Sequence, residues 1–272
     1  MAERPIGVFD SGVGGLTVLD ALRRHLPHED FLYLGDTARL PYGSKSPETV
    51  RRYARQAAGK LVERGVKLLV IACNTASAVA VEDLRDAFAP LPVVGVIDPG
   101  ADAACAASET GHVLVTGTEG TIRGGAYQRA LLARRPQLRI EAVACPLFVA
   151  LAEEGWVEGP IPEAVARRYL ERELTERQDH VDTVVLGCTH FPVLRAVLAR
   201  VCGPRVTLVD SAETTARAVA RMLQDTTLER AARPTPGTVR FLATDAPNRF
   251  ARVGAVFLGH PIREDDVELV DL

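Results

Sequence analysis

Two cysteines occupy matching positions in the sequence. Cys73 lies in LLVIACNTAS and Cys188 lies in TVVLGCTHFP, and each ends a short apolar run and precedes a segment of helical character. A thiol at such a strand-to-helix junction lies near backbone N–H donors and the positive end of the helix dipole, which stabilise a thiolate or a bound carboxylate. One such thiol could be a nucleophile. Two thiols in symmetric settings suggest that a substrate is held between them.

Residues that could assist the two thiols occur at similar junctions. Asp10 follows the first apolar run, in DSGVGG, and a carboxylate there suits an ammonium group or a general base better than a phosphate. His190 follows Cys188 by two residues, where proton transfer is as reasonable an interpretation as a capping or core role. We interpret the remaining cysteines as small core residues: Cys105, Cys145 and Cys202.

Uncharged hydrogen-bond donors lie near other predicted strand ends. They are Tyr42 and Gly43 in LPYGSKS, and Thr118 and Thr121 in GTEGT. Each is compatible with ordinary turn chemistry, but together they suit a small polar anion such as a dicarboxylate. Glu153, after the apolar CPLFVALA, is an ordinary exposed helix residue if spacing alone is considered.

The elements that must position these residues form an alternating pattern. Short apolar runs alternate with longer segments of helical period, which predicts a parallel sheet covered by helices on both faces. The predicted strands are 6–9, 31–34, 68–72, 93–97, 112–115, 139–143, 183–186 and 206–209, with a further strand at 238–243. The predicted helices are 16–25, 47–64, 76–88, 125–134, 161–178, 193–201 and 212–223.

An internal repeat relates the two halves of this pattern. GVFDSG corresponds to VLVTGT, YLGD to AVAC, VIACNT to VLGCTH, and VVGVID to VTLVDS, in the same order and at nearly constant offset. Any two doubly wound domains could look this alike, but the paired cysteines favour a true repeat. We therefore predict an α/β fold of two similar doubly wound parallel-sheet domains, 1–98 plus 210–272 and 99–209, facing each other across a cleft with pseudo-two-fold symmetry. Ligands bind beyond the carboxyl ends of parallel strands, so the two thiols should meet there.

Composition excludes several classes of function. The chain has 272 residues and a net charge of −3, which provides no broad electrostatic footprint for nucleic acid. No apolar run approaches bilayer length and the first residues lack the apolar core of a signal peptide, so we expect a soluble, cytoplasmic protein with no membrane partner. Five scattered cysteines disfavour a disulfide framework and a metal site. DSGVGG does not have the spacing of a dinucleotide loop.

Inversion at a carbon atom is one reaction that would use two thiols. A proton must leave one face of the carbon and another must arrive on the opposite face, which two fixed groups can do without moving. The developing carbanion needs stabilisation, which pyridoxal phosphate usually supplies through a lysine Schiff base. None of the three lysines (Lys45, Lys60, Lys67) lies at a predicted strand end with a phosphate loop, so a cofactor-free route fits better.

Three other classes of protein remain compatible with these residues. A Cys-His hydrolase would leave one cysteine idle and would form an acyl adduct on Cys188. A non-catalytic amino-acid-binding module would tolerate serine at both positions. A thiol redox protein would bring the cysteines within disulfide geometry, which a substrate between them would prevent.

Six motifs together carry a family resemblance. DSGVGGLTV, LPYGSKS, ACNTASAVA, GTEGTIRGGAYQ, CPLFVALAEEG and GCTHFPVL, in this order and up to about residue 225, resemble the glutamate racemase family of the aspartate/glutamate racemase superfamily. The related aspartate racemases have a similar cysteine pair but typically lack a histidine at the position of His190, which therefore favours glutamate. Phe191 stands where the family frequently has tyrosine.

The resemblance implies a cofactor-independent interconversion of L- and D-glutamate, with D-glutamate supplied to bacterial peptidoglycan and a homodimer as the assembly. Cys73 would act on the D enantiomer and Cys188 on the L enantiomer, with Asp10 and His190 assisting them and Glu153 as a further acidic group. Asp36 is a weaker candidate. The substrate contacts implied by the resemblance are Asp10, Ser11, Tyr42, Gly43, Asn74, Thr75, Thr118, Thr121, Thr189 and His190.

Overall fold

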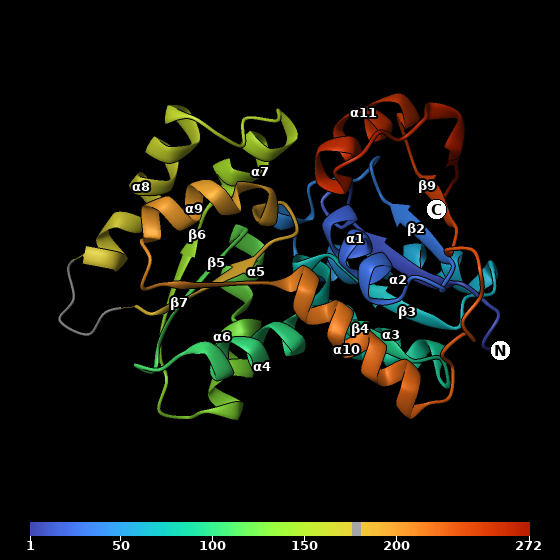
Figure 1. Cartoon of the computed structure of the whole chain (residues 1–272), viewed down its shortest axis with the longest axis horizontal. Helices are drawn as coiled ribbons and strands as arrows, with labels where there is room; N and C mark the ends of the chain where they lie inside the picture. The colour runs from blue at the N-terminus through green and yellow to red at the C-terminus, as the bar shows by residue number, and fades with distance from the viewer. Residues whose placement is uncertain (176–180) are drawn as a thin grey trace.

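The chain folds into two parallel-sheet α/β domains that lie side by side (Figure 1). The computed structural model describes residues 1–175 and 181–272. Within these residues, one sheet has the strand order β10-β9-β2-β1-β3-β4 and the other has the order β6-β5-β7-β8. The strands of the first sheet are β1 (Ile6–Asp10), β2 (Phe31–Gly35), β3 (Leu68–Ile71), β4 (Val93–Gly95), β9 (Val239–Ala243) and β10 (Val267–Leu269). Those of the second are β5 (His112–Gly117), β6 (Arg139–Ala144), β7 (Thr183–Gly187) and β8 (Thr207–Asp210).

The strand order confirms the two similar domains predicted from the sequence. The first sheet contains β2-β1-β3-β4 and the second contains β6-β5-β7-β8, which is the same succession in chain order. All pairings are parallel, so the carboxyl ends of the strands meet at one edge of each sheet. Cys73 follows β3 and Cys188 follows β7, at equivalent places in the two sheets.

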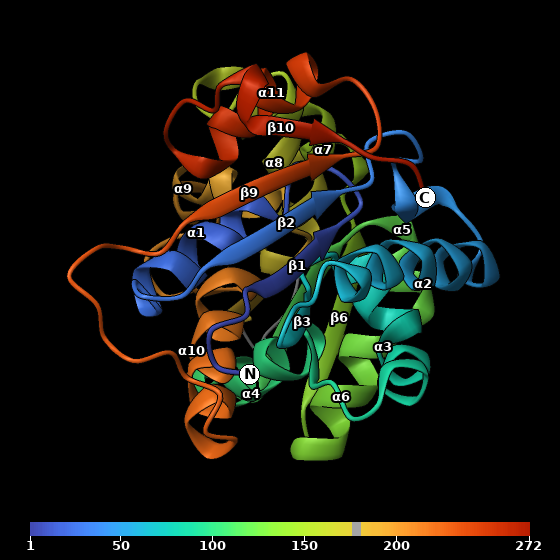
Figure 2. The ribbon, with the colours of Figure 1, turned by 90° about the vertical axis from the view of Figure 1, so that its right-hand side faces the viewer.

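Helices cover both faces of each sheet (Figures 1 and 2). The helices of the first domain are α1 (Leu16–His25), α2 (Pro47–Glu63), α3 (Asn74–Phe88), α10 (Ser211–Asp225) and α11 (Pro247–Leu258). Those of the second are α4 (Ile97–Ala107), α5 (Glu119–Gly124), α6 (Ala126–Arg134), α7 (Pro146–Glu153), α8 (Pro160–Thr175) and α9 (Arg195–Cys202). No helix in the described part of the chain has the length and apolar character needed to cross a membrane.

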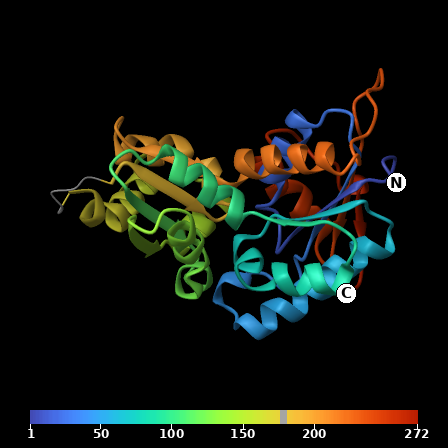
Figure 3. The same ribbon diagram turned by 90° about the horizontal axis from the view of Figure 1, so that it is seen from below.

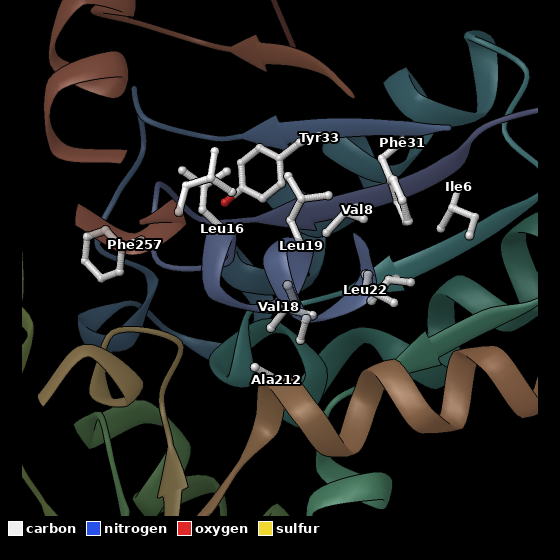
Figure 4. Close-up of a cluster of buried hydrophobic side chains, with 14 of the residues drawn as sticks. Ile6, Val8, Leu16, Val18, Leu19, Leu22, Phe31, Tyr33, Ala212 and Phe257 are labelled. Atoms are coloured by element: carbon white, nitrogen blue, oxygen red, sulfur yellow. The ribbon is translucent and has the colours of Figure 1, made fainter. Parts of the chain in front are cut away.

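Neighbouring residues along a strand point to opposite faces of the sheet and pack in separate hydrophobic cores. On one face of the first sheet, Ile6 and Val8 pack with α1, α10 and α11, and this cluster is shown in Figure 4. On the other face, Phe9 packs with α2 and α3. In the second sheet, Leu114 faces α7, α8 and α9, whereas Val113 faces α4 and α6. Burial on both faces explains why the strands appear in the sequence as unbroken apolar runs.

Capping fixes where several helices start. Ser46 accepts a hydrogen bond from the Thr49 N–H at 3.3 Å, and Pro47 occupies the first helical position of α2. Asp210, the last residue of β8, accepts from the N–H groups of Ala212 and Glu213 at 3.1 Å and so begins α10 directly. The helix α10 then runs from the second sheet back to the first domain (Figure 3).

Several predicted elements differ from the structure. The strand predicted at 93–97 ends at Gly95, because Val96 already has helical backbone angles (φ −89°, ψ −13°) and leads into α4. The helix predicted at 125–134 is preceded by α5, and Gly125 separates the two with a left-handed φ of 65° that glycine adopts readily. In the described part of the chain, the helices α4, α5, α7 and α11 and the strand β10 were not among the predicted elements. Of the helix predicted at 161–178, the last three residues lie outside the described part of the chain.

The C-terminal segment extends the first sheet. β9 pairs with β2 and β10 pairs with β9, so the segment adds two strands and α11 to the first domain. Lys67 forms a buried ion pair with Glu29, at 2.6 Å. It also donates a hydrogen bond to the carbonyl of Leu228 at 2.8 Å, and this contact holds the start of the C-terminal segment against the first domain. We propose that the domains comprise residues 1–98 plus 210–272 and residues 99–209.

Candidate active site

Cys73 forms the first half of the site. It precedes α3, its sulfur accepts from the N–H of Ala76 at 3.5 Å, and its thiol donates to the hydroxyl of Ser11 at 3.6 Å. Only 5 % of the residue is exposed. Burial raises the pKa of the Cys73 thiol to about 12, and the charges of Asp10 and Cys188 add to the rise, whereas the Ala76 and Ser11 contacts oppose it. The Cys73 thiol is therefore protonated at neutral pH.

Cys188 forms the second half and has a different neighbour. Its sulfur lies 3.9 Å from Nδ1 of His190, and 6 % of the residue is exposed. It is followed by a short 3-10 helix (Phe191–Leu194) before α9, in contrast to the long helix that starts at Cys73. The two settings that look alike in the sequence thus differ in structure: a helix start accompanies one thiol and an imidazole accompanies the other.

His190 is held by an acidic residue. Its Nε2 donates to Oε1 of Glu153 at 3.2 Å, and the other Glu153 oxygen accepts from Nη2 of Arg249 at 2.9 Å. Burial alone would lower the pKa of His190, but the contacts with Cys188 and Glu153 and the charge of Asp10 raise it to about 10. The hydrogen bond from His190 lowers the pKa of Glu153, and Arg249 lowers it further. At neutral pH the site therefore holds an imidazolium between a carboxylate and Cys188.

The interpretation of Glu153 as an ordinary exposed helix residue, based on spacing, is wrong. Its side chain is 16 % exposed, and it lies at the last position of α7 with both oxygens bonded. The preceding residues of α7 are so uniformly apolar that their pattern does not indicate which face of the helix is buried.

Asp10 lies at the boundary of the two domains. It is fully buried at the end of β1, where Oδ2 accepts from the N–H of Gly12 at 3.0 Å and Oδ1 accepts from the hydroxyl of Thr189 at 3.4 Å. Burial raises the pKa of Asp10, and the nearby His190 counteracts this. The turn after β1 must approach the second domain closely, since a Cβ on Gly14 would lie 2.5 Å from Oγ1 of Thr189. Glycine permits this contact.

Three threonine hydroxyls form a cluster between the domains. Oγ1 of Thr75, at the start of α3, lies 3.0 Å from Oγ1 of Thr118 and 3.2 Å from Oγ1 of Thr121, and the latter two are 3.1 Å apart. Gly43 lies against the same cluster, because a Cβ there would be 2.6 Å from Cβ of Thr118. The structure thus brings four of the predicted substrate contacts together from both domains.

Two predicted contacts use their side chains within the protein. The hydroxyl of Tyr42 donates to Asp36, a buried carboxylate that also accepts from Arg39 at 2.7 Å. The amide of Asn74 donates to Ser211 at 3.3 Å and accepts from Tyr127 at 2.8 Å. These side chains shape the site, and what remains for a ligand at Asn74 is its backbone N–H, because the first N–H groups of α3 have no partner within the helix.

Sequence reasoning missed Arg249, which completes the contacts of Glu153. It lies in PNRFARVGAVFL, a segment beyond the part of the chain that carries the family resemblance. No spacing relates it to Glu153, which is 96 residues earlier. Within residues 1–175 and 181–272, His, Cys, Asp and Glu side chains form no group of three or more that could hold a metal ion.

The fold and site define a class of protein: two similar α/β domains that each contribute one buried thiol to a shared site. A sequence model of the Asp/Glu/Hydantoin racemase family matches residues 7–219. A glutamate racemase of Geobacter metallireducens is 52% identical over 261 residues, which cover 95% of this chain and 94% of that protein.

Solved structures agree with the sequence relatives. A glutamate racemase of Francisella tularensis in complex with D-glutamate has a TM-score of 0.90 at 35% identity, covering 100% of this chain and 98% of that one. A glutamate racemase of Thermus thermophilus in complex with β-chloro-D-alanine has a TM-score of 0.88 at 44% identity, with the same coverage. The chain belongs to the Asp/Glu/Hydantoin racemase family and is an isomerase.

Proposed function

We propose that this protein interconverts L- and D-glutamate by a two-thiol proton transfer without a cofactor. Cys188 removes the α-proton of L-glutamate and Cys73 delivers a proton to the opposite face. In the reverse direction the two thiols exchange roles. The observation that carries the proposal is the pair of buried cysteines, one from each domain, each close in sequence to a threonine that contacts the opposite domain: Thr75 contacts Thr118, and Thr189 contacts Asp10.

The charges around the two sulfurs suit this division of roles. A protonated His190 stabilises negative charge on Cys188, whereas the raised pKa of Cys73 keeps that sulfur protonated. The protein without ligand therefore holds a proton on Cys73, ready for delivery in the L-to-D direction. An incoming substrate ammonium group near Asp10 adds positive charge and makes the thiolate of Cys73 more accessible for the reverse reaction.

The carbanion intermediate needs hydrogen-bond donors whose interaction with the substrate carboxylate becomes stronger as negative charge develops on it. The first N–H groups of α3 point toward the carboxyl edge of the sheet, next to Cys73, and the hydroxyls of Thr75, Thr118 and Thr121 lie nearby. Such fixed dipoles stabilise a developing carboxylate charge without reorganising. Asp10, Ser11 and Thr189, together with the backbone of Tyr42 and Gly43, complete the set of groups that we assign to substrate binding.

Glutamate as the substrate is supported by the relatives and by His190. The proteins that match with high identity are named glutamate racemases, and one of the matching structures holds D-glutamate. Lys67, which is buried in an ion pair with Glu29, is not placed to form a Schiff base with a pyridoxal cofactor in this site. We further propose that the protein works as a homodimer in the cytoplasm and supplies D-glutamate for peptidoglycan, as the resemblance implies.

The test is incubation of the purified protein with L-glutamate in D2O, followed by analysis of chirality and α-deuterium during the first turnovers. We expect D-glutamate that carries α-deuterium, while the remaining L-glutamate keeps its protium. Two fixed bases give this result, because the proton delivered by Cys73 comes from solvent. Deuterium in L-glutamate at the same rate as in the product would contradict the two-thiol route, and an acyl adduct on Cys188 without exchange would favour a hydrolase.

A further inference from the structure

The C-terminal helix α11 contacts two residues of the second domain's half of the site. Nη2 of Arg249, near its start, lies 2.9 Å from Oε2 of Glu153. Near its end, the ring of Phe257 packs edge-on against the imidazole of His190, with the ring centroids 5.0 Å apart. The helix itself packs in the core of the first domain through residues such as Phe250. It therefore connects the first domain to the group that assists Cys188.

Polar contacts link Arg249, Glu153, His190 and Cys188 in series. Glu153 presents one oxygen to each neighbour: Oε2 to Arg249 and Oε1 to Nε2 of His190, at 3.2 Å. Because both oxygens are held, the carboxylate cannot rotate without breaking a hydrogen bond. His190 in turn places Nδ1 at 3.9 Å from the sulfur of Cys188. This series of contacts runs from the half-exposed guanidinium of Arg249 to the buried thiol of Cys188.

We propose that Arg249 is a positioning residue: by holding Glu153 from across the domain boundary, it orients His190 for proton transfer at Cys188. Through α11, the reactivity of the Cys188 thiol thereby depends on the position of the two domains relative to each other. This inference rests on the proposed function, since it concerns the proton transfer at Cys188.

The charged groups around this series of contacts come from several elements. His190 faces Cys188 and Glu153, and the charge of Asp10 at the end of β1 also raises the pKa of His190. Glu153 faces His190 and Arg249. A cavity of about 70 Å3 beside Arg249 is also lined by Asp245, which precedes α11. Of these groups, Arg249 is the positive charge that acts on Glu153 from the first domain.

The experiment compares Arg249→Gln with Arg249→Lys and with Arg252→Gln, a control at an exposed arginine on the same helix. Arg249→Gln should lower kcat/KM for glutamate by roughly threefold to tenfold, since the Arg249 side chain is 51% exposed and such pairs are weak. The primary isotope effect with α-deuterated L-glutamate should rise more than that with the D enantiomer. The acidic limb of the pH profile should move to higher pH, because Glu153 loses a positive neighbour that lowers its pKa. Arg249→Lys should restore the position of the limb.

A second measurement does not depend on activity. The ring signals of His190 in 15N-labelled protein without substrate, assigned by their loss in His190→Gln, should shift in Arg249→Gln and stay unchanged in Arg252→Gln. If wild type racemises glutamate and Arg249→Gln changes neither the pH limb nor the His190 signals, the inference is overturned. If wild type does not racemise glutamate, the proposed function fails, and the His190 signals still decide whether Arg249 controls the imidazole.

Discussion

At the scale of single residues, the two thiols differ in how their charge is controlled. Cys73 depends on backbone and hydroxyl donors, which stabilise a thiolate weakly against burial and the charge of Asp10. Cys188 depends on His190, a full positive charge when protonated. The proposed mechanism needs one thiolate and one thiol at a time, and the surroundings of Cys73 favour its protonated form before substrate binds.

Replacing either cysteine should stop racemisation. We expect Cys73→Ala and Cys188→Ala each to lower kcat/KM by at least about 10³-fold, because losing one proton-transfer group removes delivery on one face. Cys105→Ala, at a partly buried cysteine outside the site, is the matched control. Full activity of either alanine variant in a circular-dichroism assay would exclude the two-thiol mechanism.

Serine variants should show which direction each thiol serves. The equilibrium constant between enantiomers is unity, so kcat/KM must fall equally in both directions, and only the isotope effect can differ. Cys188→Ser should raise the primary α-deuterium isotope effect for L-glutamate, and Cys73→Ser should raise it for D-glutamate, since a poorer base makes proton removal more rate-limiting. Competition between α-deuterated and protiated substrate measures this, and equal effects in both variants would contradict the assignment.

Protonation of His190 should also contribute to stability. The pKa of His190 is raised from 6.5 to about 10 in the folded protein, so the contribution is fully present below pH 6.5 and is lost as the pH rises through about 10. We expect the free energy of unfolding of wild type relative to His190→Gln to decrease between these values, as measured by urea denaturation at each pH. A difference that is constant or increases over this range would show that His190 is not protonated in the folded state.

At the scale of elements, the sequence predicted the strands and the residues that follow them, because motifs at strand ends combine apolar runs with glycine and polar residues. Other elements lacked such signals. In α7 the sequence PLFVALAE is apolar almost throughout, so it has no helical period. The helix α11 begins after Ala246, which has a left-handed φ of 47° that the sequence pattern does not predict. β10 has three residues and depends on pairing with β9. The Arg249 contact with Glu153 depends on this distant packing, which explains why spacing could not reveal it.

The loop that contains Gly43 should not tolerate a side chain. In Gly43→Ala the new Cβ would meet Thr118 at 2.6 Å and push the loop away from the threonine cluster. Overpacking of this kind costs about 1–3 kcal/mol, so we expect KM for glutamate to rise roughly fivefold to 100-fold. Gly59→Ala, within α2, has its nearest neighbour at 3.9 Å and should leave KM unchanged while stabilising the helix by up to about 1 kcal/mol. Steady-state kinetics compares the two, and an unchanged KM in Gly43→Ala would show that the loop can move without loss.

At the scale of the whole molecule, the site belongs to neither domain alone. Asp10 contacts Thr189, Thr75 contacts Thr118, and Arg249 contacts Glu153, and each of these pairs joins the two domains. Cys73 and Cys188 lie beside these contacts and are both buried, with 5 % and 6 % of each residue exposed. We therefore expect glutamate to reach the two thiols through separation of the domains, with closure around the ligand excluding water from the proposed carbanion.

Chemical modification of the thiols should report this opening. With a small thiol reagent and peptide mass spectrometry, we expect Cys73 and Cys188 to react more slowly than the partly buried Cys105 and Cys202. D-glutamate at roughly 100 times its Kd should slow modification of the two site cysteines about 100-fold, because ligand that binds only the closed form depletes the open form in proportion. Cys105 faces Leu131 of α6 and Cys202 packs against the core formed with α7, α8 and α9, so both belong to the second domain's own cores and should react at the same rate with and without ligand. Equal protection of all four would indicate general stabilisation, whereas no protection of Cys73 and Cys188 would mean that glutamate does not bind between the sulfurs.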